Sequence, residues 1–235
     1  MAAVSLSLLI SRWPIEYSFA LIGGAALAAV CLWEPAIGLG LAVILGPAKS
    51  FLAIARPDLP SDLGQLFFAL GLAGWLVRGL VRRKVAIPRT RLWLPLGAYI
   101  LVGLSSLTQA ASLEEGLKEA LKWIEIALAA AILVSEAERG RLKWIVAAIL
   151  IAGLGQAVVG IWQYQFRGTG PEHFRITGDT YRAYGSFEQP NPYGGFLGLI
   201  WPVAFGLTIG QFSSWAECWR RDAGGRQRMT AHCLL

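Results

Sequence analysis

Residues 144–162 read WIVAAILIAGLGQAVVGIW, an apolar run without a charged residue. A run of this length can cross the hydrocarbon core of a bilayer as a helix. Inside lipid the backbone must pair its own amides and carbonyls, so the run predicts a helix. Similar apolar runs recur along the chain, and the short polar stretches between them hold nearly all the charges. The sequence therefore predicts an all-α protein, a polytopic transmembrane helix bundle.

Composition agrees with this fold class, because 55% of the 235 residues are hydrophobic and only 15% are charged. We expect residues 1–212 to form the transmembrane domain and residues 213–235 to form a weakly structured cytoplasmic tail. The three cysteines indicate no disulfide or metal framework. About seven spans are predicted by length and hydropathy: 17–33, 36–55, 62–80, 92–108, 120–135, 144–162 and 192–212.

The basic residues determine the expected orientation. Segment 78–91 holds six basic residues and no acid, which is typical of a loop that stays in the cytoplasm. The basic stretch 135–143 and the tail then fall on the same side. This explains the net charge of +6 without a nucleic-acid partner. We expect a multi-pass protein of the bacterial inner membrane, with external segments 49–61, 108–119 and 163–191.

The external loop 163–191 is the longest polar stretch, and it contains Arg167, Arg175 and Arg182 among aromatic residues. Positive charges are disfavoured outside the membrane, so an anionic ligand at the outer leaflet would explain them. The planar guanidinium suits a diphosphate because it grips two oxygens at once. Four tyrosines are expected either in the ordinary interfacial aromatic belt or stacked on sugar rings: Tyr164, Tyr181, Tyr184 and Tyr193.

The end of this loop leads into the last span. Asn191 lies between Pro190 and Pro192, so it is expected to cap that helix or, alternatively, to contact a ligand. Gly194, Gly198, Gly206 and Gly210 recur at fourfold spacing around Pro202 and predict a closely packing face.

Upstream, residues 112–125 have apolar side chains at helical spacing. They predict an interfacial helix on the outer leaflet, either as a plain connector or with a substrate role.

Two motifs carry a resemblance to a known family. Gly160-Ile-Trp-Gln-Tyr164 closes one span, and Arg182-x-x-Gly185-x-Phe187-x-x-Pro190-Asn191-x-x-Gly-Gly-x-Leu197 opens the next. Together they resemble the O-antigen ligase/polymerase-like membrane glycosyltransferases. The order of Ser61-Asp62-Leu63, a basic loop and an amphipathic stretch up to Trp123 is similar as well.

The resemblance implies a metal-independent transferase without a cofactor, built from about a dozen helices. Its partners would be a glycan donor carried by undecaprenyl diphosphate, a glycan or lipid acceptor, and membrane lipids. The enzyme would act at the periplasmic face in lipopolysaccharide or polysaccharide biosynthesis. Family arginines contact the lipid diphosphate, which corresponds most directly to Arg182 and then to Arg167 and Arg175. Tyr184 and Asn191 complete the expected substrate-binding residues.

Family members continue with further helices and a periplasmic loop that bears a histidine. Neither His173 nor His232 corresponds to that histidine, so the catalytic residues stay unassigned. The resemblance thus covers an N-terminal part of the family. A truncated or frameshifted product would explain this and the altered composition of 213–235, and it would be inactive alone.

A different class of function stays open, namely a non-catalytic multi-span membrane protein or remnant. A transporter is a further alternative, and it would show charges buried within spans or inverted repeats around broken helices. Lys49, near Pro47, and Glu125 are the charges of this kind in the sequence, which has no visible repeat.

Overall fold

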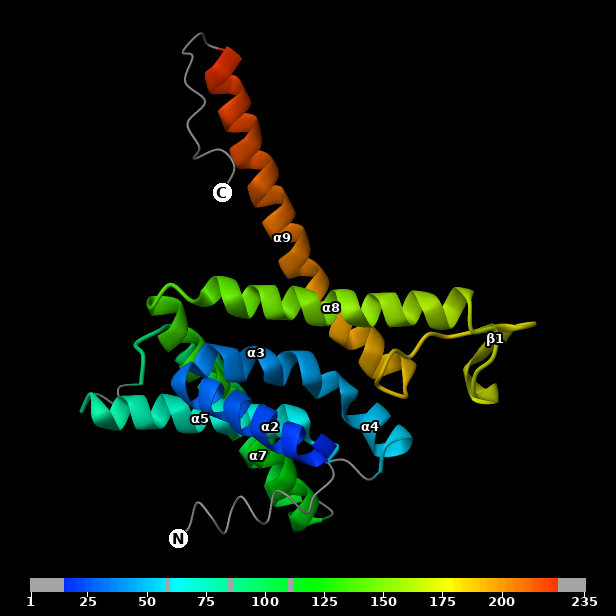
Figure 1. The fold of residues 1–235 in the computed structure, drawn as a ribbon, viewed down its shortest axis with the longest axis horizontal. Coiled ribbons are helices and arrows are strands. Elements are labelled where there is room, and N and C mark those ends of the chain that lie inside the picture. Colours follow the sequence, from blue (N-terminus) through cyan, green and yellow to red (C-terminus); the bar gives the residue numbers. More distant parts are fainter. Residues whose placement is uncertain (1–14, 58–59, 84–86, 110–111, 224–235) are drawn as a thin grey trace. The chain divides into compact units, whose positions relative to one another are not determined.

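The structure is a computed structural model that describes residues 15–57, 60–83, 87–109 and 112–223 (Figure 1). The regular secondary structure of these residues is helical apart from one short hairpin. The elements are α2 (Ile15–Trp33), α3 (Pro35–Leu45), η1 (Gly46–Ala48), α4 (Lys49–Ala55), α5 (Leu63–Val81), α6 (Trp93–Ser106), η2 (Leu107–Gln109), α7 (Leu113–Glu138), α8 (Leu142–Gln165), η3 (Glu172–Phe174), β1 (Arg175–Thr177), β2 (Thr180–Tyr181) and α9 (Pro190–Ala223). Residues 224–235, including His232 and the end of the predicted tail, lie outside the description.

Among the described residues, four helices are long and apolar enough to cross a membrane, which indicates a membrane protein. They coincide with four of the seven predicted spans: Pro35–Ala55, Leu63–Val81, Leu142–Gln165 and Pro190–Phe212. Helix α6 has 14 residues, and α7 carries charges along its first half. The count of seven therefore stays a prediction.

Helix α7 joins two segments that the sequence analysis separated. The interfacial helix expected at 112–125 and the span expected at 120–135 form one continuous helix of 26 residues. Ser112 begins it, because its hydroxyl accepts a hydrogen bond from the Glu115 amide at 3.4 Å. No breaking residue follows, so the helix continues to Glu138.

The chain divides into two compact units, which are described separately. Unit 1 contains the described residues up to Lys49 and Pro57–Ala148, and unit 2 contains Ser50–Arg56 and the chain from Ile149 onward. In unit 1, α3 and α5 approach closely at glycines. A Cβ on Gly38 would lie 2.7 Å from the Gly71 Cα, and one on Gly64 would lie 2.7 Å from the Gly46 Cα. Small residues at such a crossing let two helix backbones pack directly.

In unit 2, α8 packs against α9. A Cβ on Gly153 would lie 2.7 Å from Ile200 Cγ2, so this glycine admits the larger side chain. The glycine face of the last span, which we predicted to pack closely, is not where this contact forms. Cβ atoms at Gly194, Gly198 and Gly206 would meet no atom within 4 Å. The close helix contact therefore uses a glycine of α8 and not Gly194, Gly198 or Gly206 of α9.

The two ends of α9 correct two further predictions. The helix begins at Pro190, so Asn191 lies inside its first turn and does not cap it. Pro190 suits the first helical position because its fixed φ is helical and that position needs no amide donor. At the other end the helix runs to Ala223, so 213–223 are helical where a weakly structured tail was expected.

Candidate functional site

The candidate site is built on the loop between α8 and α9, near the strand labelled β1 in Figure 1. Two glutamines of α8 hold the loop. The Gln163 amide accepts hydrogen bonds from the Tyr184 and Gly185 backbone amides at 3.0 and 2.8 Å, and it donates to the Gly185 carbonyl at 2.9 Å. Gln156 accepts from the Ser186 amide at 3.1 Å and donates to its hydroxyl at 2.7 Å. Three consecutive backbone amides are therefore fixed by neutral side chains.

Local geometry explains the two motifs quoted above. Gly185 has φ +56°, a conformation that residues with a Cβ rarely adopt. A Cβ there would also lie 2.5 Å from the Gln156 Oε1 and from the Tyr193 ring. Tyr193 reaches across to α8 and donates to the Gln156 carbonyl at 3.2 Å. The motif that ends α8 and the motif that begins α9 thus contact each other within unit 2.

Arg167 and Tyr184 contact each other within the loop. Tyr184 is only 4% exposed, and its ring packs on Phe174 with ring centroids 5.6 Å apart. Arg167 donates to the Tyr184 hydroxyl and lies over its ring. The Tyr184 ring is therefore part of the loop's interior in this structure. Within the described parts of the chain, Arg167 has the Tyr184 phenol and no carboxylate as its partner.

Arg175 is occupied by neighbours on the hairpin. It donates to the Tyr181 hydroxyl at 3.0 Å and forms an ion pair with Glu172 at 2.8 Å. The hydrogen bond to Tyr181 raises the pKa of Arg175 above its ordinary value, and the negative charge of Glu172 adds to this shift. Of the three predicted arginines, Arg175 is thus the one neutralised locally.

Arg182 lies at the edge of a cavity of about 320 Å³. Its backbone amide donates to the Phe174 carbonyl at 2.9 Å, which places the residue beside η3. Among the described residues, no hydrogen bond or ion pair involves its guanidinium, which is exposed. Arg182 therefore borders the cavity with a positively charged guanidinium group.

The cavity also contains residues that the sequence analysis did not assign. Its lining includes Asn191, for which ligand contact stays a prediction, together with His173 and Glu188. Glu188 has φ +57°, an uncommon conformation for a residue with a side chain. The Gln-Pro-Asn-Pro turn that follows Glu188 was the available signal, but a turn does not reveal which side chains face inward.

No protein-family model, curated protein or solved structure matches this chain. Within the described parts of the chain, no three or more His, Cys, Asp or Glu side chains gather as metal ligands. The fold and the site define a helical membrane protein. It has an arginine-bearing cavity in the loop between two of its long apolar helices.

Proposed function

We propose that this chain binds a polyprenyl-diphosphate-linked glycan and belongs to a transferase of the O-antigen ligase type. The single observation that carries the proposal is Arg182, whose guanidinium has no partner among the described residues and lines a cavity in the loop. The two motifs around this loop resemble that family. The loop is expected on the periplasmic side of the inner membrane, where such a glycan would be presented.

The proposed chemistry uses Arg182 for charge stabilisation. An acceptor sugar hydroxyl would attack the anomeric carbon, and the bond from that carbon to the diphosphate would break. Negative charge then grows on the leaving diphosphate, and a fixed guanidinium stabilises it without reorganisation. Arg167, whose partner among the described residues is the neutral Tyr184 phenol, adds positive potential nearby. Arg175 contributes least, because Glu172 neutralises it.

The loop's support favours this role. Preorganised ligand groups work best when other residues fix their backbone. Here Gln156 and Gln163 hold residues 184–186 through neutral amides. Arg182 is therefore positioned two residues from a fixed turn without using its own charge.

The test measures donor binding by the full chain in neutral detergent, with farnesyl diphosphate as the probe. Loss of a charge-assisted hydrogen bond costs about 1.5–3 kcal/mol, so Arg182→Ala should weaken binding roughly ten- to hundredfold. Arg182→Lys should recover part of this affinity, because it keeps the charge and loses the planar fork. The matched control, Arg175→Ala, should stay within about twofold, since its charge is already neutralised.

Equal affinities for farnesyl diphosphate in wild type, Arg182→Ala and Arg182→Lys, with all three proteins folded, would rule out the proposal. Equal losses in Arg182→Ala and Arg175→Ala would show only a general attraction of the loop for anions. A circular dichroism spectrum and a monodisperse elution profile for each variant separate either result from misfolding.

One observation favours a transporter as the second candidate function. The apolar helix Pro35–Ala55 is interrupted by the 3-10 turn Gly46–Ala48. Beside it lies a cavity of about 350 Å³ whose lining includes Lys49, Asp62 and Glu125. Broken helices beside charged groups are typical of transport sites. Farnesyl diphosphate binding that depends on Glu125 and not on Arg182 would favour this candidate.

A further inference from the structure

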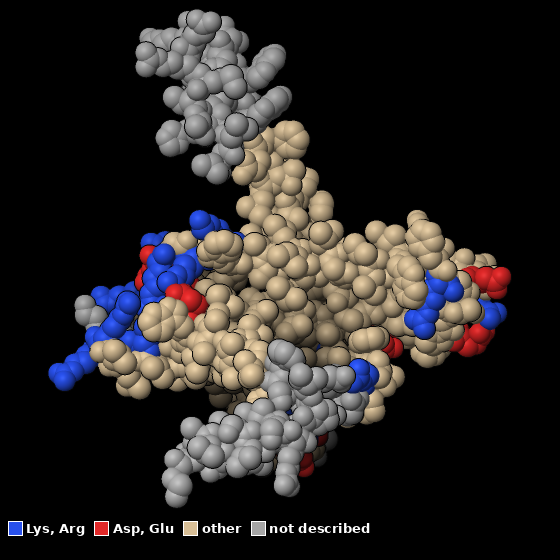
Figure 2. Space-filling view, viewed as in Figure 1, with Lys and Arg blue, Asp and Glu red and all other residues tan. Residues whose placement is uncertain are grey.

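A third and larger cavity lies in unit 1, remote in sequence from the loop between α8 and α9. Its volume is about 650 Å³, and its charged lining residues are Arg78, Arg82, Arg139, Arg141 and Glu34. Figure 2 shows Lys and Arg side chains gathered, with fewer acids, at one end of this unit. Apolar side chains, including Leu32, Val77 and Val81, complete the lining.

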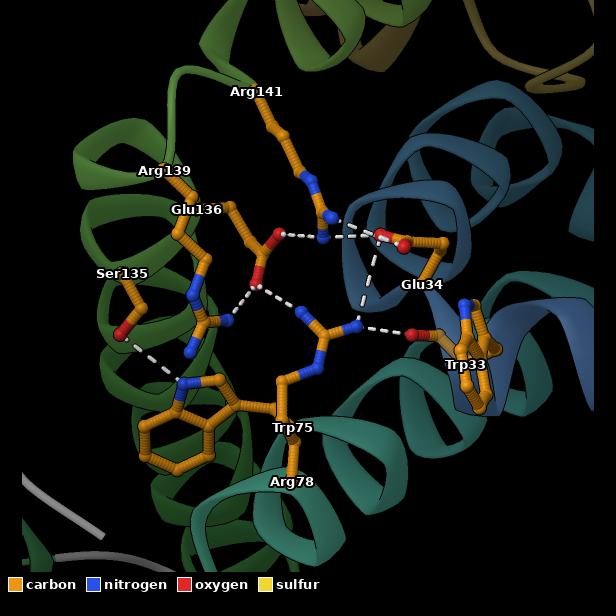
Figure 3. Close-up of polar contacts among 8 residues, drawn as sticks. All are labelled: Trp33, Glu34, Trp75, Arg78, Ser135, Glu136, Arg139 and Arg141. Carbon is orange, nitrogen blue, oxygen red and sulfur yellow. Dashed lines mark hydrogen bonds and ion pairs between the residues drawn. The ribbon is translucent and has the colours of Figure 1, made fainter. Parts of the chain in front are cut away.

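The wall of the cavity is held by Glu136, a carboxylate with no exposed surface (Figure 3). Glu136 accepts from Arg139 at 2.5 Å, from Arg141 at 3.1 Å and from Arg78 at 3.4 Å. These contacts join the end of α5 to the turn between α7 and α8.

Glu34, in the turn between α2 and α3, extends the same network. Arg141 donates to the Glu34 carboxylate at 3.0 Å, and Arg78 lies 3.7 Å from it. Arg78 also donates to the Trp33 carbonyl. The ends of α2, α5 and α7 and the starts of α3 and α8 therefore meet in one network. Its long-range ion pairs are Arg78–Glu34, Arg78–Glu136 and Arg141–Glu34.

The charges of the cavity lining and of Glu136 behind it do not cancel. Four arginines bring four positive charges, and Glu34 and Glu136 bring two negative charges, so a net charge of +2 remains. Uncompensated charge beside apolar helices is costly, and an anion would lower that cost.

The side chains of Arg82 and Arg139 have unused N–H donors, and both residues line this cavity. Among the described residues, no hydrogen bond or ion pair involves the Arg82 side chain, which is exposed. Arg139 uses a single guanidinium nitrogen, on Glu136, although a guanidinium offers five N–H donors. Two guanidinium groups with unused N–H donors therefore border one cavity, an arrangement that suits tetrahedral oxyanions.

We propose that this cavity binds a phosphate group, held by Arg82 and Arg139 while Arg78 and Arg141 keep the helices in place. The site is at the end of unit 1 that the basic loops predict to be cytoplasmic. Two sources fit this chemistry, the headgroup of an anionic lipid in that leaflet and a small soluble phosphate compound. Basic pockets between helices near the cytoplasmic surface bind anionic headgroups in this way.

The test uses the full chain in neutral detergent and three probes: dioctanoyl phosphatidylglycerol, inorganic phosphate and, as the zwitterionic lipid, dioctanoyl phosphatidylcholine. Native mass spectrometry counts bound molecules and gives their affinities. Wild type should retain one phosphatidylglycerol or one phosphate. Arg82→Gln and Arg139→Gln should each bind roughly ten- to hundredfold more weakly, because each loses a charge-assisted hydrogen bond.

Two controls make the result specific. Arg89→Gln removes a charge from the same basic segment without touching the cavity lining, and it should leave affinity within about twofold. Arg182→Ala alters the loop in unit 2 and should leave this binding unchanged, which separates this site from the proposed diphosphate site.

Binding of phosphatidylglycerol without inorganic phosphate would identify a lipid headgroup as the source, and binding of inorganic phosphate alone would identify a soluble ligand. Absence of binding by wild type to both anionic probes would overturn the proposal. So would an Arg89→Gln loss as large as that of Arg82→Gln, or equal binding of phosphatidylcholine and phosphatidylglycerol, since either would indicate unspecific adsorption.

Discussion

The Glu136 network in unit 1 and the loop between α8 and α9 in unit 2 both use arginines, but they hold the chain by different means. In unit 1 carboxylates tie the helix ends together, and Glu136 is completely buried. In unit 2 the backbone is held by the neutral amides of Gln156 and Gln163. Arg182 therefore has no structural task. A guanidinium is available to a ligand where other groups hold the backbone, as at Arg182, or where some of its donors are unused, as at Arg139 beside Glu136.

The largest expected effect comes from Glu136→Ala, which would leave Arg78, Arg139 and Arg141 without their shared acceptor. Removal of one partner from a buried ion pair costs about 3–5 kcal/mol. We expect this loss in reversible unfolding by a denaturing detergent. Glu138→Ala is the control, because Glu138 is exposed two residues away on the same helix, and it should change stability by less than about 0.5 kcal/mol. Similar stabilities of the two variants would mean that the network does not hold the helix ends.

A smaller effect is expected for Gln163→Ala, which leaves the amides of Tyr184 and Gly185 and the carbonyl of Gly185 without their partner. A buried polar group that loses its hydrogen bond costs about 1–3 kcal/mol. Amide hydrogen exchange should accelerate at residues 184–186 and remain unchanged around Glu136. Gln165→Ala, an exposed position two residues further along α8, should leave both regions as in wild type. Unchanged exchange at 184–186 in Gln163→Ala would show that the glutamine does not hold the turn.

Sequence patterns predicted the long apolar helices well, because membrane length and hydropathy are local properties. Helices Leu63–Val81 and Leu142–Gln165 coincide with expected spans to within a few residues. Helix packing was less predictable. The glycines of α9 have the spacing of a packing face, yet the close contacts use Gly38 on α3 and Gly153 on α8. Small residues permit an approach, but their spacing does not specify the partner.

Long-range pairing also limited the prediction of the two charged regions. Glu34 and Arg141 are far apart in the chain, so no local pattern indicates that they meet. Two polar residues in an apolar helix, Gln156 and Gln163, were an available signal, because their spacing of about two turns places them on one face. Arg182 was identified from its loop alone. The partners that occupy Arg167 and Arg175 became known only from the structure.

The basic segments of the sequence predict that the loop 163–191 lies on the periplasmic side and that the segment 78–91 lies in the cytoplasm. Accessibility of single cysteines to a membrane-impermeant maleimide in spheroplasts tests this directly, in a chain with Cys31, Cys218 and Cys233 replaced by serine. Asp179→Cys serves for the loop because Asp179 is exposed beside Gly178, whose φ of +54° must be kept. Arg89→Cys serves for the basic segment. The account predicts that Asp179→Cys reacts in intact spheroplasts and that Arg89→Cys reacts only after permeabilisation. Reaction of both in intact spheroplasts, or the reverse order, would contradict it.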